Sequence, residues 1–211
     1  MSIRVMLVDD HALIRRGLRD SLLEADDIEV VGEAGNYAEW RQLARQQVCD
    51  VLILDINMPG RSGMEILEAQ AELAEAPGVL MLSQYGEDQY GIRAMKAGAM
   101  GYLNKTADPD EIIQAVRRIA AGQKVITPAL ASALIENLNE SIAQHPHQSL
   151  SERELQTCVM IARGTRLSEM ARELTLSPKT VSVYRARVLE KLGLGSNAEI
   201  AAYALRHGLI D

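Results

Sequence analysis

Four short apolar runs in the first half of the chain each lead into polar or charged residues. The runs are residues 3–8, 51–54, 79–82 and 101–104, and the residues that follow them are Asp9 and Asp10, Asp55, Ser83 and Lys105. Runs of this length and composition indicate buried strands. In an open α/β sheet the carboxyl ends of the strands gather at one edge, where ligands bind. We therefore expect these carboxylates, the hydroxyl and the ammonium group to lie together.

Strand and helix patterns alternate through this half. Predicted strands are residues 3–8, 28–33, 51–54, 79–82 and 100–103, and predicted helices are 13–23, 38–45, 63–73, 90–97 and 108–121. The first helix has an apolar or small face of Leu13, Gly17, Leu18, Ser21 and Leu22. Strict alternation predicts an α/β fold with a doubly wound, five-stranded parallel sheet and helices on both faces.

After Gly122 only helices are expected. One covers residues 128–138, a polar segment follows, and four more cover about 152–163, 167–174, 178–192 and 197–206. Ser151 and Glu154 form a capping-box pattern. A short helix, a turn and a longer helix that opens at Ser177-Pro178 make a helix-turn-helix. We predict a first domain at residues 1–122, a linker with a helix at 123–147, and a smaller all-α domain at 148–211.

Charge is distributed unevenly along the chain. The net charge is −7, yet the part from His147 onward has nine Lys and Arg against seven Asp and Glu. An acidic first part and a mildly basic second part suggest different partners. Cys49 and Cys158 are far apart, as expected for free thiols in a reducing cytosol. No apolar run approaches the ~20 residues that span a bilayer, so we expect a cytoplasmic protein without a membrane partner.

Asp55 is the predicted nucleophile of the first domain. A carboxylate can attack phosphorus and form an acyl phosphate. Asp9 and Asp10 can hold a hard cation such as Mg²⁺, which offsets the repulsion between the two anions. Lys105 would contact the phosphoryl oxygens, and Ser83 would donate a hydrogen bond to them. Each of these residues, taken alone, could instead have a purely structural role. Asp10, for example, could cap a helix that begins near His11.

The chain up to residue 125 resembles a response-regulator receiver domain. The matching segments are Asp9-Asp10, Asp55, Met58-Pro59-Gly60-x-x-Gly63, Ser83 and Gly98-Ala99-x-Gly101-Tyr102-x-x-Lys105. The resemblance implies a flavodoxin-like fold and transfer of a phosphoryl group from a sensor histidine kinase to Asp55. It also implies that the backbone carbonyl of Asn57 completes the metal site.

Tyr102 would be the aromatic switch of such a domain, turning inward when Ser83 moves toward the phosphate. The alternative is a half-buried strand aromatic. The chain also departs from the common receiver pattern. Many receivers have a proline after the lysine, joined to it by a cis peptide bond. In this chain Thr106 follows Lys105, and because a cis bond before a non-proline residue is costly, we do not expect one here. Gln84 stands where a small residue is frequent.

The helix predicted at 178–192 has distinct faces. Val181, Tyr184, Val188 and Leu192 should pack inward. The outward face would meet base edges in a major groove, and the flanking cations would meet phosphates. The predicted DNA contacts are Lys179, Thr180, Ser182, Val183, Arg185, Ala186, Arg187 and Lys191. The alternative is an ordinary amphipathic helix with a solvated charged face.

The second domain resembles the LuxR-type DNA-binding domain. The resemblance is carried by Ser149-Leu150-Ser151-Glu152-Arg153-Glu154, Leu174-x-x-Ser177-x-x-Thr180-Val181 and Leu189-Glu190-Lys191-Leu192. Nearly the whole chain is thus similar to a NarL/FixJ-type response regulator, and residues 177–187 and 204–208 are most similar to the GacA/UvrY-like branch. Ser182 and Ala186 are neutral where some members carry lysine, which weakens the case for base contacts from these two positions.

This resemblance implies a two-component transcription regulator that is not an enzyme. Its expected partners are double-stranded promoter DNA, a second copy of the chain after phosphorylation, and RNA polymerase. The last helix, with Ala201, Ala202 and Leu205, could form the dimer surface or pack in the core. A rival is an aspartyl phosphatase of the haloacid-dehalogenase type, but those enzymes carry a second aspartate where this chain has Asn57. Another rival is a regulator that works without phosphate.

Overall fold

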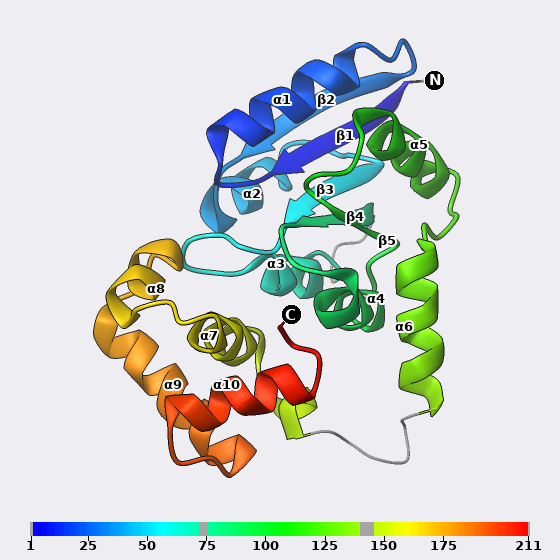
Figure 1. Ribbon diagram of the computed structural model, residues 1–211. Helices are drawn as coiled ribbons and strands as arrows, with labels where there is room; N and C mark the ends of the chain where they lie inside the picture. Colours follow the sequence, from blue (N-terminus) through cyan, green and yellow to red (C-terminus); the bar gives the residue numbers. More distant parts are fainter. Residues whose placement is uncertain (1, 72–75, 140–145, 211) are drawn as a thin grey trace. The chain divides into compact units, whose positions relative to one another are not determined.

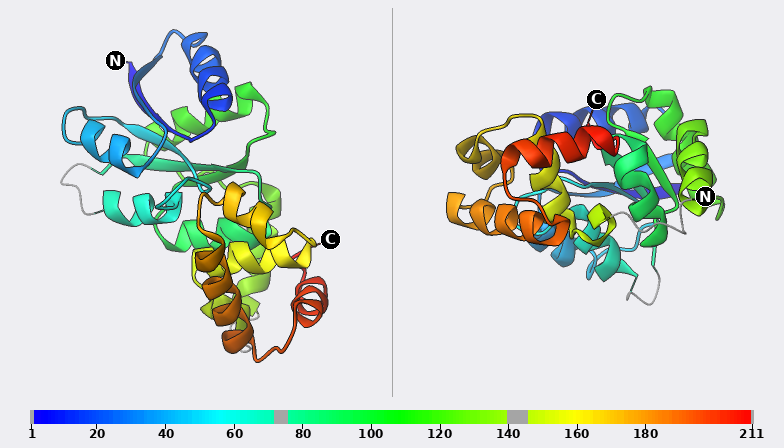
Figure 2. Two further views of the ribbon diagram at one scale, coloured as in Figure 1. Left: turned by 90° about the vertical axis from the view of Figure 1, so that its left-hand side faces the viewer. Right: turned by 60° about the horizontal axis from the view of Figure 1, so that its bottom comes forward.

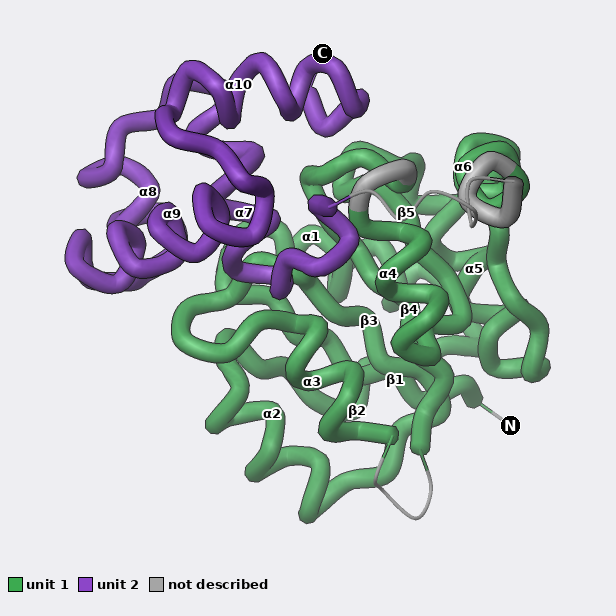
Figure 3. The backbone as a smooth tube through the Cα atoms, turned by 90° about the horizontal axis from the view of Figure 1, so that it is seen from below, with its two compact units in different colours: residues 1–137 green, residues 138–211 purple. Residues whose placement is uncertain are grey.

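The computed structural model describes residues 2–71, 76–139 and 146–210. The chain divides into two compact units, residues 1–137 and 138–211 (Figure 3). Within the described ranges, no helix combines the length and the apolar character that crossing a membrane requires.

The first unit is built on a five-stranded parallel sheet (Figure 1). Its strands are β1 (Ile3–Val8), β2 (Ile28–Ala34), β3 (Val51–Asp55), β4 (Gly78–Ser83) and β5 (Gly101–Asn104). They are arranged in the order β2-β1-β3-β4-β5. All pairs are parallel, so the carboxyl ends of β1, β3 and β4 share one edge. The predicted α/β fold is confirmed.

Helices cover both faces of this sheet. They are α1 (Ala12–Leu23), α2 (Tyr37–Leu43), α3 (Gly63–Gln70), α4 (Ile92–Lys96) and α5 (Pro109–Ala120). Helices α1 and α5 lie on one face, and α2, α3 and α4 lie on the other (Figure 2). Leu22 of α1 and Val116 of α5 share a buried cluster with Val5, Ile53 and Leu80 of the strands. The end of the helix predicted at 63–73 lies outside the described residues.

The apolar or small face predicted for α1 is wrong at Leu13 and Gly17, which are both exposed. Leu13 is 83% exposed, whereas Leu22 is buried. Ile14 and Leu18 are partly buried. These two residues precede Leu22 at intervals of four, so they form one row along the helix, and Leu13 lies one position away from that row.

The helix predicted at 90–97 begins earlier, as a single π-helical turn, η1 (Glu87–Gly91), that continues into α4. Helix α6 (Pro128–Asn139) packs against this turn within the first unit. The hydroxyl of Thr127 donates a hydrogen bond to the Glu87 carboxylate, and Leu130 is fully buried. A Cβ atom at Gly91 would lie 2.8 Å from Leu130 Cδ1, so glycine permits the close approach. The helix predicted in the linker therefore has a packing partner that the sequence did not reveal.

The second unit is helical and contains the predicted helix-turn-helix. Its elements are η3 (Pro146–Ser149), α7 (Glu152–Ala162), α8 (Leu167–Glu173), α9 (Pro178–Leu192) and α10 (Asn197–Arg206). The capping box of Ser151 and Glu154 starts α7, and Ser177 caps α9. Thr175 in the turn has φ 52°, and Gly193 ends α9 with φ 66°. Positive φ suits glycine and is uncommon for threonine, so Thr175 adopts a sparsely populated backbone conformation at this turn.

Candidate metal centre and nucleic-acid interface

The strand-end residues of the first unit meet at the carboxyl edge of the sheet. The ammonium group of Lys105 lies 2.6 Å from Asp9 Oδ2 and 2.8 Å from Asp55 Oδ2. The side chains of Asp9, Asp55 and Lys105 are 3%, 2% and 5% exposed, so the three ion-paired groups are almost completely buried from solvent. Three residues from distant parts of the sequence are thereby brought together, as the pattern of strand ends predicts.

Burial sets the electrostatics of the cluster. Loss of solvent raises the pKa of Asp55 to about 6, Lys105 opposes the rise, and the Asp9 carboxylate adds to it. Burial also disfavours the charged form of Lys105, but its ion pairs with Asp55 and Asp9 outweigh this and raise its pKa. The site therefore holds more negative charge than Lys105 alone neutralises, and an added cation would stabilise it.

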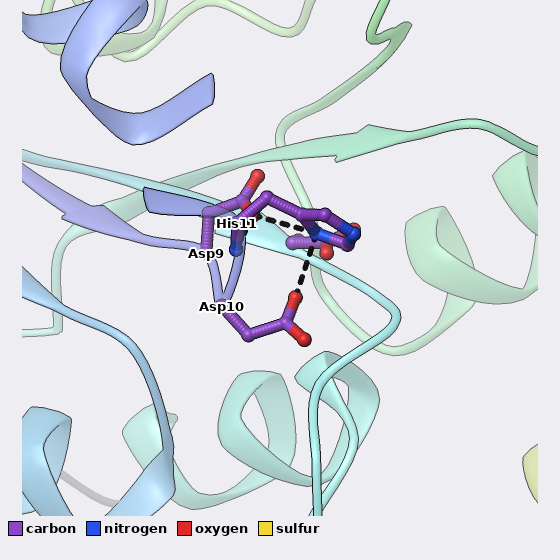
Figure 4. A group of neighbouring side chains, drawn as sticks. Asp9, Asp10 and His11 are labelled. Carbon is purple, nitrogen blue, oxygen red and sulfur yellow. Dashed lines mark hydrogen bonds and ion pairs between the residues drawn. The ribbon is translucent and has the colours of Figure 1, made fainter. Parts of the chain in front are cut away.

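The donor set suits a divalent metal ion. One ligand atom each from Asp9, Asp10, His11 and Asp55 can be chosen so that all lie within 4.8 Å of one another. Figure 4 shows the ring nitrogen of His11 joined by dashed lines to a carboxylate oxygen of Asp9 and to one of Asp10. Asn57 lies just beyond β3, and its side-chain amide donates to the Tyr85 hydroxyl over 2.9 Å. Carboxylate oxygens are ligands that Mg²⁺ accepts, so the residues present fit this ion.

Ser83 and Tyr102 are linked through Tyr85, a residue that the sequence analysis missed. The Tyr85 backbone N–H donates to Ser83 Oγ over 3.1 Å, and the Tyr102 hydroxyl donates to the Tyr85 carbonyl over 3.0 Å. Tyr102 is fully buried. The Tyr85 ring stacks on Tyr90 with 4.7 Å between the ring centroids. Only the position of Tyr85, two residues after Ser83, could have pointed to it.

Glycine at position 63 lets the chain pass very close to the end of β3. The Gly63 N–H donates to the Ile56 carbonyl over 2.9 Å. A Cβ atom at this position would lie 1.9 Å from the Asp55 carbonyl oxygen. The second glycine of the Met58-Pro59-Gly60-x-x-Gly63 segment is thus required by packing.

The peptide bond between Lys105 and Thr106 is trans, as are all the peptide bonds of the described residues.

Helix α9 presents its expected outward face to solvent. Val181, Val188 and Leu192 are buried, and Tyr184 is partly buried. Of the predicted DNA contacts, Thr180 and Arg185 are partly buried, and the exposed ones are Lys179, Ser182, Val183, Ala186, Arg187 and Lys191. Val183 is 45% exposed.

Two cations of α9 have partners inside the unit. Arg185 Nε donates to Asn197 Oδ1 over 2.6 Å. The Lys191 ammonium group lies 2.6 Å from Glu154 Oε2 and donates to the Ser149 carbonyl over 3.1 Å. Glu154 caps α7, so Lys191 ties the end of α9 to the start of α7. This ion pair could not be predicted from local patterns, because the two residues lie 37 positions apart in the sequence.

Comparison with known proteins identifies both units. Residues 5–117 match the family described as response regulator receiver domain, and residues 148–204 match the bacterial regulatory proteins of the luxR family. The chain therefore belongs to the response regulators of two-component systems, with a receiver domain followed by a LuxR-type DNA-binding domain.

Full-length relatives agree with this assignment. Response regulator GacA of Pseudomonas aeruginosa is 38% identical over 214 residues, covering 99% of this chain and 98% of the relative. Response regulator UvrY of Escherichia coli K12 is 38% identical over 210 residues, covering 99% and 96%. The expected similarity to the GacA/UvrY-like branch is confirmed.

Solved structures show the same architecture. The crystal structure of response regulator ChrA, from a heme-sensing two-component system, is 34% identical with a TM-score of 0.53 and covers 99% of both chains. RcsB from Salmonella enterica serovar Typhimurium, bound to promoter rprA, is 20% identical with a TM-score of 0.65 and covers 96% of this chain and 98% of its own. At 20% identity, the similarity to RcsB shows a shared fold and nothing further.

Proposed function

We propose that Asp55 accepts a phosphoryl group from a sensor histidine kinase and that the phosphorylated chain dimerises on promoter DNA, which it binds through α9 to regulate transcription. The observation that carries this proposal is the buried Asp55 carboxylate 2.8 Å from the Lys105 ammonium group, beside the Asp9 carboxylate. This arrangement provides a nucleophile together with a fixed positive charge for the incoming phosphoryl oxygens. Incubation with acetyl phosphate tests the acceptor role, and titration with DNA tests the output.

Asp9, Asp10, Asp55 and the backbone carbonyl of Asn57 would hold Mg²⁺. When bound, the ion would offset the repulsion between the Asp55 carboxylate and the anionic phosphoryl donor. Lys105 is already placed to contact the transferred group, because its ammonium group lies between two of the carboxylates. Asp55 is nearly buried, so water has little access to the bond that forms.

The same residues connect the acceptor to a switch. The Ser83 hydroxyl accepts a hydrogen bond from the Tyr85 backbone, and the buried Tyr102 hydroxyl is bonded to the Tyr85 carbonyl. Movement of Ser83 toward the phosphate would break or strain the first bond and shift Tyr85, and with it Tyr102. Phosphorylation changes the population of the active form only if it stabilises that form more than the inactive one.

The remaining assignments belong to the same proposal. Residues 1–122 form the receiver domain, 123–147 the linker with its helix, and 148–211 the DNA-binding domain. The protein acts in the cytoplasm, because a kinase-dependent DNA-binding protein must meet both its donor and the chromosome there. RNA polymerase is a further partner. The chain is a regulator and not an enzyme, because the acid/base position of an aspartyl phosphatase is Asn57.

The DNA contacts divide into two kinds. Ser182, Val183 and Ala186 form the exposed centre of α9, which would face the base edges. Ser182 and Ala186 are neutral and small, so they would let the helix approach the bases and would contribute little direct readout. Lys179 lies near the start of α9 and Arg187 on its flank. Thr180, Arg185 and Lys191 border this surface. The partners of Arg185 and Lys191 within the unit hold these side chains in place, so the loss of either would disturb the fold as well as the DNA contacts.

Arg187→Ala is expected to weaken DNA binding through the loss of one phosphate contact. Arg187 is exposed on α9, so its removal should leave the fold intact. The logarithm of the DNA affinity falls as the logarithm of the salt concentration rises, and each lost phosphate contact makes this slope less steep by about 0.9. The measurement is fluorescence anisotropy with a labelled duplex across a salt series.

The matched control is Arg45→Ala, which removes the same charge from an exposed site in the first unit. It should leave the salt slope unchanged. An Arg187→Ala slope equal to that of the unaltered chain would contradict the contact assigned to this side chain.

A further inference from the structure

The ring of His11 takes no part in starting the helix that follows it. His11 is the N-cap residue of α1, but its side chain makes no capping hydrogen bond. Its backbone N–H instead donates to Asp9 Oδ1 over 2.8 Å and so orients that carboxylate. The usual reason for a polar side chain at a helix start is therefore missing at this position.

The ring faces the acidic cluster instead. His11 Nδ1 lies 2.9 Å from Asp10 Oδ1 and 3.3 Å from Asp9 Oδ1 (Figure 4). One atom each from Asp9, Asp10, His11 and Asp55 falls within 4.8 Å of the other three. Ligands on opposite sides of a six-coordinate ion with bonds of about 2.1 Å are about 4 Å apart. The imidazole nitrogen is thus close to a ligand position of the same ion that the carboxylates would hold.

Buried oxygens of the cluster also favour a cation. Asp9 Oδ2 and Asp55 Oδ2 are inaccessible to solvent, so water cannot offset their negative charge. Both depend on the ion pair with Lys105. One ammonium group shared by two buried carboxylates, with Asp10 beside them, leaves an excess of negative charge that a divalent ion would offset.

We propose that His11 supplies a nitrogen ligand to the metal centre and thereby shifts its preference from Mg²⁺ toward the first-row transition ions that favour imidazole. Ni²⁺ is the ion that tests this preference, and Mn²⁺ serves as the spectroscopic probe of the bond. This inference rests on the proposed metal-assisted acceptor function of the same site. Mg²⁺ is bound almost entirely by oxygen, whereas imidazole is a favourable ligand for transition ions. The carboxylates serve both kinds of ion, so the ring is the group that discriminates between them.

Pulsed electron paramagnetic resonance of the Mn²⁺-loaded full chain tests the bond directly. A nitrogen bonded to Mn²⁺ gives a magnetic coupling that an oxygen ligand does not. We expect this signal in the unaltered chain and its loss in His11→Ala. The control His207→Asn, which changes a histidine of the second unit, should keep the signal.

Calorimetric titration tests the preference. His11→Ala should lower Ni²⁺ affinity by on the order of tenfold or more, because imidazole suits Ni²⁺, and leave Mg²⁺ affinity within about twofold, because the oxygen ligands remain. His11→Asn retains a residue favoured at helix starts and should lose Ni²⁺ affinity in the same way, which separates loss of the ring from loss of the helix end. Asp9→Asn should weaken the binding of both ions, which shows that Ni²⁺ occupies the acidic cluster.

Each outcome bears on a distinct claim. A wild-type chain that binds Mn²⁺ without nitrogen coupling overturns the role of His11 and leaves the proposed acceptor site intact. Equal losses of Mg²⁺ and Ni²⁺ affinity in His11→Ala also overturn it, because the residue would then act only through Asp9 and Asp10. Failure of the wild-type chain to bind either ion overturns the metal centre of the proposed function together with this inference.

Discussion

Asp55→Asn is expected to abolish the gain of one phosphoryl group that acetyl phosphate and Mg²⁺ produce in the unaltered chain. The amide that replaces the carboxylate has no anionic oxygen to attack phosphorus. The variant should still fold. Burial raises the pKa of Asp55 to about 6, so the folded chain binds this proton more tightly than the unfolded chain does. The contribution of protonated Asp55 to the free energy of unfolding is therefore present at low pH and is lost as the pH rises through about 6. An asparagine side chain does not ionise, so the variant avoids that loss.

Intact mass spectrometry gives the readout. Asp20→Asn makes the same chemical change on an aspartate of α1 whose side chain is 57% exposed, and it should gain one phosphoryl group as the unaltered chain does. A phosphoryl group on Asp55→Asn under these conditions would place the acceptor elsewhere. Thermal unfolding at neutral pH should show the Asp55→Asn variant to be at least as stable as the unaltered chain.

Gly63→Ala is expected to destabilise the first unit by ~3 kcal/mol or more. The new Cβ atom would lie 1.9 Å from the Asp55 carbonyl oxygen, and backbone on both sides of the contact must move to relieve the overlap. The strand end that carries Asp55 would be displaced, so phosphoryl acceptance should fall as well. Trp40 is the single tryptophan and is buried in the first unit, so its fluorescence during urea unfolding reports on that unit alone.

Gly17→Ala is the matched control. Gly17 lies within α1, where an added Cβ atom would meet no other atom within 4 Å. Alanine is favoured over glycine inside a helix by about 0.5–1 kcal/mol, so this variant should be slightly more stable. Equal stability of Gly63→Ala and the unaltered chain would show that the loop after β3 can move away from Asp55 at little cost.

The sequence predicted the sheet and the meeting of its strand ends because both depend on local patterns. Apolar runs that end in Asp9, Asp55 and Ser83 specify buried parallel strands, and parallel strands must place those residues at one edge. The helix boundaries of the second unit were equally readable. Ser177 and Gly193 are residues whose side-chain and backbone preferences start and end a helix.

Contacts between distant side chains were not predictable in this way. Tyr85 bonds to Asn57 and Tyr102, and Lys191 bonds to Glu154, through geometry that only the assembled fold defines. Helical periodicity placed Leu13 on the apolar face of α1, but the buried row is set by how the helix packs on the sheet, and Leu13 remains exposed. The packing of α6 on the first unit has the same origin.

The ring of His11 illustrates the limit most clearly. Its place before a predicted helix indicated a residue at a helix start, and the structure confirms that position. The same position also turns the ring toward Asp10, which depends on how the chain leaves β1. The position of His11 at the start of a helix could be predicted from the sequence, whereas the direction in which its ring points could not.

The DNA affinity of one preparation before and after phosphorylation tests the central claim most directly. The probe is a duplex selected from a random pool by the phosphorylated chain, and Asp55→Asn treated in the same way is the control. We predict that phosphorylation of the unaltered chain raises its affinity by about tenfold, within the usual range of coupling between two sites, and that the treated variant stays at the unphosphorylated value. Equal affinity in all three samples, with mass spectrometry showing the phosphoryl group in place, would contradict control of DNA binding through Asp55.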